Sequence, residues 1–231
     1  LLDDPAAEDC GICDNCTGDT TGTTAARQLS VEVIAEAEHF LRTRPIEFNA
    51  KKMYLVGDSG GRKRIPTDEL IEDGRVLSMW GDAGWGQLAR DGKVAADRFD
   101  DRLVEALAEL VEEWSPDPTP EWVTSVPSTR HPELVARFAE RVAVRLGVPF
   151  HPVVERLVDR PEQRRQQNSA HQQANVAGAF GVSGAVVDGP VLLVDDVVDS
   201  GWTMTEVGRV LRRAGVPLVY PVALASSAGR D

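Results

Sequence analysis

Val191-Leu-Leu-Val-Asp-Asp-Val-Val-Asp-Ser-Gly-Trp-Thr203 runs from four apolar residues to two adjacent acids and then to a Ser-Gly-x-Thr turn. The apolar run favours a strand buried on both faces, which is typical of a parallel sheet covered by helices. Ligands of open α/β folds bind at the carboxyl edge of the sheet, where Asp195 and Asp196 would lie. The turn then starts a helix, whose unpaired N–H groups favour an anion. This segment predicts an α/β fold with a site for hydroxyl and phosphate groups.

The sequence around this segment continues as strands alternating with helices. Gly147 and Gly215 each follow a stretch with helical periodicity, as helix C-caps commonly do. Such alternation indicates an α/β domain with a parallel sheet, which we place at residues 119–231. The expected strands are 121–126, 191–194 and 218–225, the expected helices 133–146 and 203–214, with extended chain at 148–158 and a polar loop at 159–175.

Ser115-Pro-Asp-Pro-Thr-Pro120 is the clearest candidate for a domain boundary. Three prolines within five positions cannot continue a helix or pair inside a sheet. Before them, residues 25–115 begin with a helix capped by Ser30 and end with an apolar stripe between Phe99 and Trp114. Short strands are expected between these helices, at 46–48 and 53–56. We therefore expect a separate, small α+β domain over residues 25–115.

Residues 1–18 contain all three cysteines of the chain, Cys10, Cys13 and Cys16. Two overlapping C-x-x-C steps suit thiolate coordination of zinc, which takes four tetrahedral ligands. An iron–sulfur cluster and uncoordinated thiols are the alternatives. Because no cysteine elsewhere could staple the fold by a disulfide, we expect a reducing, cytoplasmic compartment.

The composition restricts the class of protein. With 25 Lys and Arg against 37 Asp and Glu, the 231 residues carry a formal net charge of −12, which argues against a wholly basic nucleic-acid binder. The longest apolar runs are far below the ~20 residues of a membrane-spanning helix, so we expect no membrane contact. The first residues lack a positive region followed by a long apolar one, so we expect no secretory signal.

One region is locally basic despite the acidic composition. Residues 41–65 hold seven cations and two acids, a local net charge of +5, and Gly60-Gly-Arg-Lys-Arg64 would suit a turn that contacts phosphates. The alternative is a solvated basic turn. The residues that we predict to contact DNA are Lys51, Lys52, Arg62, Lys63, Arg64, Arg164 and Arg165.

The segment from Val191 to Thr203 resembles the signature of the phosphoribosyltransferases. Residues 122–130 resemble the strand and loop that hold pyrophosphate in that family, closest to its ComF-like branch. Residues 164–169 and 175–180 resemble the mobile loop of that branch and its continuation. The resemblance, which covers residues 119–231, implies binding of phosphoribosyl pyrophosphate with Mg²⁺. The residues that it implicates are Ser128, Thr129, Arg130, Asp195, Asp196, Asp199, Ser200, Gly201, Trp202 and Thr203.

Three departures from that family lead us to expect binding with poor transfer. Asp199 adds a negative charge beside the phosphate loop, where the family usually has a small neutral or hydroxyl residue. Trp202 puts a large ring at a loop position that is normally small. There is also no evident hood to recognise a nucleobase. The alternative is an active phosphoribosyltransferase.

Cys-x-x-Cys-Asp-x-Cys resembles the end of the tetracysteine zinc module of RecQ-type DNA helicases, in which a winged-helix domain follows. This resemblance implies a fourth zinc ligand upstream of Leu1, a zinc module ending near residue 18 and a winged-helix-like DNA-binding domain at 25–115. Followed by a phosphoribosyltransferase-like domain, this order resembles the C-terminal region of a bacterial RecQ-like ATP-dependent helicase. No G-x-x-x-x-G-K-[ST] loop occurs, so the ATP-binding motor would lie outside this chain.

The combined resemblance implies a DNA-binding accessory region of a helicase that acts in unwinding or repair. It further implies a cytoplasmic, nucleoid-associated bacterial protein with structural zinc, DNA as a partner and a phosphorylated small molecule or DNA end as a ligand. A protein-interaction scaffold is a third alternative.

Overall fold

The computed structural model describes residues 31–44, 46–56, 61–158 and 169–228. Residues 1–40 and 41–231 form two separate units. In the first unit, the described residues belong to helix α3 (Val31–Thr43), which contains no buried residue. The expected helix is therefore present, whereas its expected cap, Ser30, lies outside the described residues.

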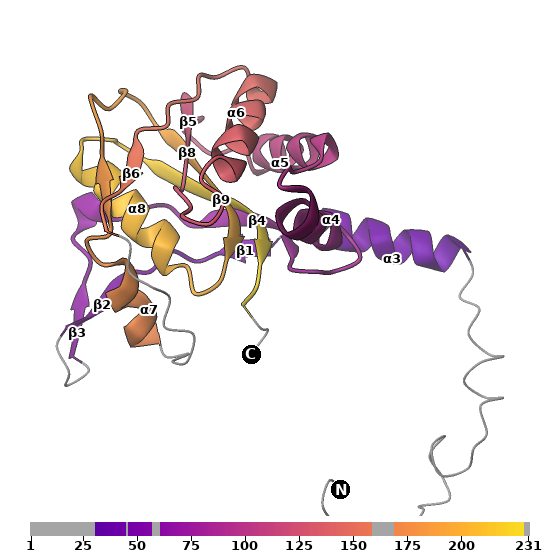
Figure 1. The fold of residues 1–231 in the computed structure, drawn as a ribbon, viewed down its shortest axis with the longest axis horizontal. Helices are drawn as coiled ribbons and strands as arrows, with labels where there is room; N and C mark the ends of the chain where they lie inside the picture. The colour runs from indigo at the N-terminus through magenta and orange to yellow at the C-terminus, as the bar shows by residue number, and fades with distance from the viewer. Residues whose placement is uncertain (1–30, 45, 57–60, 159–168, 229–231) are drawn as a thin grey trace, which may run out of the picture. The chain divides into compact units, whose positions relative to one another are not determined.

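A five-stranded sheet forms the centre of the second unit (Figure 1). Its strand order is β1 (Ile46–Phe48), β4 (Gly74–Met79), β9 (Val219–Ser226), β8 (Val191–Val198) and β5 (Trp122–Ser125). The last four strands are parallel, and β1 pairs antiparallel with β4. The predicted α/β fold with a mostly parallel sheet is thus confirmed. Two small antiparallel sheets accompany it, β2 (Met53–Val56) with β3 (Gly61–Arg64) and β6 (Val154–Arg156) with β7 (Phe180–Val182).

Helices cover both faces of the sheet, as Figure 1 shows. Successive side chains of a strand point to opposite faces. In β8, Leu192 and Val194 therefore pack with α5 (Asp101–Trp114) and α6 (Leu134–Leu146). Leu193, on the other face, packs with α8 (Trp202–Arg213). The remaining described helical elements are η1 (Thr67–Glu69), α4 (Gly86–Asp91), η2 (Gly92–Ala96) and α7 (Ser169–Val176).

Local chemistry explains where the long helices begin and end. The Asp100 carboxylate accepts a hydrogen bond from Arg102 N at 2.9 Å, which caps the start of α5. Hydrogen bonds from the Arg102 guanidinium and backbone lower the pKa of Asp100 to about 2. Helix α6 ends at Gly147, whose φ of +73° suits a glycine C-cap. Both helices lie within two residues of their expected ranges.

The boundary expected at residues 115–120 differs from the structure. Strand β4 lies before these prolines and β9 after them, yet the two strands pair in parallel, with Val76 opposite Ala223. Helix α5 likewise packs in one core with α6. Residues 41–115 and 119–231 therefore build one unit rather than a winged-helix domain joined to an α/β domain. The prolines do end a helix, and two of them, Pro116 and Pro120, are buried where the chain turns back onto the sheet.

Several predictions concern residues outside the described ranges. These residues are Cys10, Cys13 and Cys16 of the predicted zinc site and Arg164 and Arg165 of the predicted DNA contact. The zinc module and that part of the DNA contact stay predictions. Within the described ranges, no helix is both long enough and apolar enough to cross a membrane.

Candidate functional site

Two buried carboxyl groups lie near the carboxyl end of β8. Asp195 is 7% exposed and Asp196 is 5% exposed. The backbone N–H of Asp196 donates to Asp195 Oδ1 at 2.8 Å. Burial, together with the neighbouring Asp196 charge, raises the pKa of Asp195 well above its ordinary value. A buried acid with a shifted pKa at a sheet edge marks a candidate functional site.

Lys93, which lies in η2, approaches the second carboxylate. Its Nζ is 2.9 Å from both Oδ1 and Oδ2 of Asp196, a residue 103 positions further along the chain. The Lys93 side chain remains 29% exposed, whereas that of Asp196 is 7% exposed. The positive charge also lowers the pKa of Asp195, in opposition to the effect of burial. Sequence analysis missed Lys93, because no motif or periodicity connects it with the acids.

The predicted phosphate loop follows β8 and leads into α8. Gly201 is the N-cap of that helix, with a φ of +80° that favours glycine. A Cβ atom at this position would lie 2.7 Å from Cε2 of Phe48, so a side chain has no room there. The N–H groups in the first turn of a helix have no hydrogen-bond acceptor within the helix. They can therefore donate to a bound anion. The loop therefore has the backbone geometry that the sequence predicted.

Other predicted residues of this loop take different positions. Trp202, the large residue that we noted at this loop position, is 6% exposed, so it is buried at the start of α8. Ser200 and Thr203 are half-buried, and Asp199 is exposed. Asp199 accepts a hydrogen bond from Gln172 Nε2 of α7 at 3.1 Å. The structure thus adds Gln172 to the surroundings of the loop.

A cavity of about 150 Å³ lies beside the phosphate loop. Lys51, Asp199 and Ser200 contribute to its lining. The Lys51 backbone N–H donates to Thr205 Oγ1 at 3.2 Å, which ties this segment to α8. Lys51, which we predict to contact DNA, lies beside the phosphate loop. Lys52, the next predicted DNA contact, forms an exposed ion pair with Asp73 at 3.3 Å.

The loop predicted to hold pyrophosphate begins at the same edge of the sheet. Strand β5 pairs in parallel with β8, and Val126 N donates to Val194 O at 2.9 Å. Thr129 and Arg130 are exposed, and Ser128 Oγ accepts from His131 N at 3.3 Å. The parallel register therefore brings residues 128–130 to the edge that also carries the two acids.

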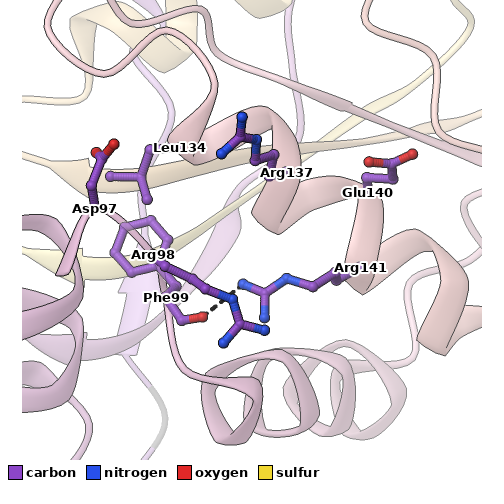
Figure 2. Close-up of a pocket in the computed structure, with 7 residues that line it drawn as sticks. All are labelled: Asp97, Arg98, Phe99, Leu134, Arg137, Glu140 and Arg141. Carbon is purple, nitrogen blue, oxygen red and sulfur yellow. Dashed lines mark hydrogen bonds between the residues drawn. The ribbon is translucent and has the colours of Figure 1, made fainter.

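A larger cavity, of about 300 Å³, lies between α6 and the segment before α5. Figure 2 shows Arg98 and Arg141 lining it together with Phe99. The Arg141 guanidinium donates to Phe99 O at 2.7 Å and pairs with Asp101, which also binds Arg98. Since acids already neutralise these guanidinium groups, we do not assign the ligand to this cavity.

The carboxylates near the phosphate loop fit a Mg²⁺ ion only if the ion is also held by the phosphates of a bound ligand. Among the described residues, no group of three or more His, Cys, Asp or Glu side chains is arranged to hold a metal. Mg²⁺ commonly binds through one or two carboxylates together with substrate phosphates. Asp195 and Asp199 offer such oxygens, whereas the Asp196 carboxylate is engaged by Lys93. The ion would supply positive charge between the acids and a pyrophosphate group.

Comparison with known protein families finds a match over part of the chain. Residues 136–229 match the phosphoribosyl transferase domain family. No curated protein matches the chain. Similar solved structures include a purine phosphoribosyltransferase from Pyrococcus horikoshii, with 21% identity, a TM-score of 0.37 and coverage of 57% of this chain and 76% of that one.

Two further solved structures are similar over different shares of the chain. Adenine phosphoribosyltransferase from Saccharomyces cerevisiae has 19% identity, a TM-score of 0.39 and coverage of 55% of this chain and 67% of that one. Orotate phosphoribosyltransferase from Aeropyrum pernix has 17% identity, a TM-score of 0.36 and coverage of 84% of this chain and 79% of that one. The buried acids and the Gly201 turn lie within residues 136–229, which match the phosphoribosyl transferase domain family over less than half of the chain.

Proposed function

We propose that this domain binds a phosphorylated sugar of the phosphoribosyl pyrophosphate class and transfers its phosphoribosyl group poorly. The observation that carries the proposal is the buried pair Asp195 and Asp196, placed directly before a helix whose cap is Gly201. Carboxylates accept hydrogen bonds from ribose hydroxyls, while the N–H groups of the helix start donate to a phosphate. A ribose that carries a phosphate has both kinds of group, so one such ligand would satisfy both the carboxylates and the start of the helix.

Charge-assisted hydrogen bonds would provide most of the affinity. A helix dipole contributes only about 0.3–1 kcal/mol at an exposed end, whereas hydrogen bonds to charged groups are roughly twice as strong as neutral ones. Lys51 lines the cavity beside the loop and brings a positive charge to a lining that also holds Glu47 and Asp199. The cavity of about 150 Å³ is smaller than the ≈300 Å³ at the lower end of small-molecule sites. This size supports binding of a phosphate group rather than of a whole nucleobase.

Calorimetry with phosphoribosyl pyrophosphate tests the binding. We expect binding that requires Mg²⁺, because Lys93 offsets only the charge of Asp196, and the carboxyl groups of Asp195 and Asp199 still oppose a pyrophosphate. Inorganic phosphate, which carries less charge, is expected to bind weakly without the metal. The matched control is the double variant Asp195→Asn, Asp196→Asn, which keeps the side-chain size and should lose Mg²⁺-dependent binding. If neither ligand binds the wild-type protein, the proposal is wrong.

A pyrophosphate-release assay with the common nucleobases tests the transfer. We expect little or no release, because catalysis requires the acceptor to be held in line with the donor and the described residues show no base pocket beside the loop. The bulk of Trp202 in the loop is the second reason for this expectation. Robust release with any base would establish the alternative, an active phosphoribosyltransferase.

We also propose that the β2–β3 hairpin binds nucleic acid. Arg62, Lys63 and Arg64 are consecutive, exposed residues of β3, and none of them has an ion-pair partner within the described part of the chain. Residue pairing across the hairpin sets Arg64 opposite Met53. Met53 is 45% exposed, so cationic and apolar groups lie next to each other. Such a surface fits a phosphate backbone with adjacent bases.

Replacing Arg62, Lys63 and Arg64 with Ala tests the hairpin. Each neutralised phosphate changes the slope of log K against log salt by about 0.9 for duplex DNA, so the triple variant should flatten the slope by roughly 2–3. Affinity should fall equally for all sequences, as fluorescence anisotropy at several salt concentrations would show. A triple substitution of Arg102, Arg137 and Arg145 on α5 and α6 controls for net charge. An unchanged slope in the hairpin variant would leave the hairpin a solvated surface.

The helicase context remains a separate proposal, supported by the cysteine spacing and by the basic hairpin. Zinc would be held by Cys10, Cys13, Cys16 and a fourth ligand, and metal analysis of a longer chain tests this directly. About one zinc per chain is expected, because a tetrahedral thiolate site holds one ion. Iron with sulfide, or no metal, would contradict the zinc module.

A further inference from the structure

The ion pair between Lys93 and Asp196 is an unusual feature of a site for ribose hydroxyls. Lys93 Nζ donates a hydrogen bond to Asp196 Oδ1 and lies 2.9 Å from Oδ2, yet Oδ2 is buried and accepts no hydrogen bond, so one acceptor is engaged and the other is held beside the ammonium. Lys93 lies outside the matched domain of residues 136–229. Its side chain is partly exposed, so a ligand that enters the site can reach the ammonium.

The backbone that carries Lys93 has a special geometry. Helix η2 is a single wide turn with π-type hydrogen bonding, a form found often at functional sites. It ends at Asp97, a non-glycine residue with a φ of +47°. Asp97 Oδ1 lies 2.8 Å from Nδ1 of His131, directly after the 128–130 loop. The same turn therefore contacts β8 through Lys93 and the predicted pyrophosphate loop through Asp97.

We propose that Lys93 is a ligand-binding residue that moves from the Asp196 carboxylate to the pyrophosphate group when the ligand enters. The proposal rests on the proposed function of the site. Movement of the ammonium would open both oxygens of Asp196 to the ribose hydroxyls, and a pyrophosphate offers the ammonium another anionic partner. Because η2 lies between the acids and the loop at 128–130, the side chain needs to move only from one partner to the other.

Two ligands separate this role from a structural one. Phosphoribosyl pyrophosphate and ribose 5-phosphate share the sugar and the 5′-phosphate, and only the first carries pyrophosphate. In Lys93→Met, calorimetry with Mg²⁺ should show at least a tenfold weaker affinity for phosphoribosyl pyrophosphate. Affinity for ribose 5-phosphate should not fall, because Asp196 is released for the hydroxyls. Lys93→Arg, which keeps the charge, should restore most of the first affinity.

A second pair of variants removes the risk that an uncompensated Asp196 prevents folding. In Asp196→Asn, Lys93 is still available to pyrophosphate, whereas in the double variant Lys93→Met, Asp196→Asn neither charge is present. We expect the double variant to bind phosphoribosyl pyrophosphate more weakly than Asp196→Asn does. Arg145→Met removes two ion pairs, with Glu105 and Glu112, at the C-terminal end of α6. It is the control and should leave both affinities unchanged.

The outcomes distinguish the possible roles of Lys93. Equal affinity of Asp196→Asn and the double variant would mean that Lys93 acts only through Asp196, and the proposal would be wrong. An equal loss for both ligands in Lys93→Met, or a gain for both, would also overturn it, in favour of a structural or a purely blocking residue. If the wild-type protein binds neither ligand, the proposed function of the site itself fails.

Discussion

A fragment of residues 119–231 is expected to remain unfolded, whereas residues 41–231 should fold cooperatively. The shorter fragment lacks β4 and α5, and therefore exposes the edge of β9 and one face of the sheet. Helix α5 alone buries Leu103, Val104, Leu107 and Val111. At about 1.5–3 kcal/mol for each side chain, this contribution is of the order of the 5–15 kcal/mol net stability of a whole domain.

Circular dichroism and urea unfolding of both fragments measure this effect. The expected result for 41–231 is a single sigmoidal transition, and for 119–231 a featureless baseline or aggregation through the exposed strand edge. The longer fragment is the control, because it contains the same residues 119–231 and adds residues 41–118 with β4 and α5. A cooperative transition of residues 119–231 would show that the sheet is stable without β4 and that the prolines at 115–120 separate two domains.

Asp195→Asn is expected to stabilise the protein at neutral pH while weakening ligand binding. The pKa of Asp195 is raised by burial and by the charge of Asp196. A carboxyl with a raised pKa contributes stability below its unfolded value of about 3.9, and this contribution is lost as the pH rises through the folded pKa. Asparagine has the same side-chain shape and keeps an oxygen that can accept the hydrogen bond from Asp196 N. Because it does not ionise, its contribution to stability does not fall as the pH rises. We expect a gain of about 1–3 kcal/mol, the usual cost of a polar group buried without full compensation.

Urea unfolding of wild type and Asp195→Asn across the acid-to-neutral range tests the prediction. The difference in unfolding free energy between Asp195→Asn and wild type should be small at about pH 3.9, the pKa of an aspartate in the unfolded chain. It should grow as the pH rises. Asp196→Asn is the contrasting control, because it leaves Lys93 without its carboxylate. It should destabilise the protein by less than the about 3–5 kcal/mol of a fully buried pair, since Lys93 is partly exposed. A pH-independent difference for Asp195→Asn would mean that Asp195 does not titrate as proposed.

Much of the local structure could be predicted because it depends on neighbouring residues. The apolar run at 191–194 indicated a fully buried strand, and β8 is that strand. The short strands at 46–48 and 53–56 have the predicted bounds. Gly201 was predicted to open a helix, and its positive φ and the nearby Phe48 ring explain why glycine is required. Periodicity and turn chemistry act over a few residues, so sequence patterns report them well.

The partners of these elements could not be predicted in the same way. A short strand such as β4 has the same pattern whether it pairs within a small α+β domain or, as here, with β9 near the end of the chain. The prolines at 115–120 end α5 in either case. We therefore predicted β1, β2 and α5 but not β4, α4 or η2, and the structure joins all of them to residues 119–231 in one unit. The domain to which a strand belongs depends on its pairing with a strand distant in sequence. This pairing does not change the hydrophobic pattern of either strand.

The sequence by itself determined the α/β class, the buried strand with its two acids and the turn that opens α8. Only the tertiary structure decided which residues surround those acids. It brought Lys93 to Asp196 across 103 positions, placed Lys51 beside the phosphate loop and buried the ring of Trp202. The physical reason is that a strand or a turn is specified by short-range backbone and side-chain preferences. The charge that meets a buried carboxylate depends instead on how the whole chain packs around it.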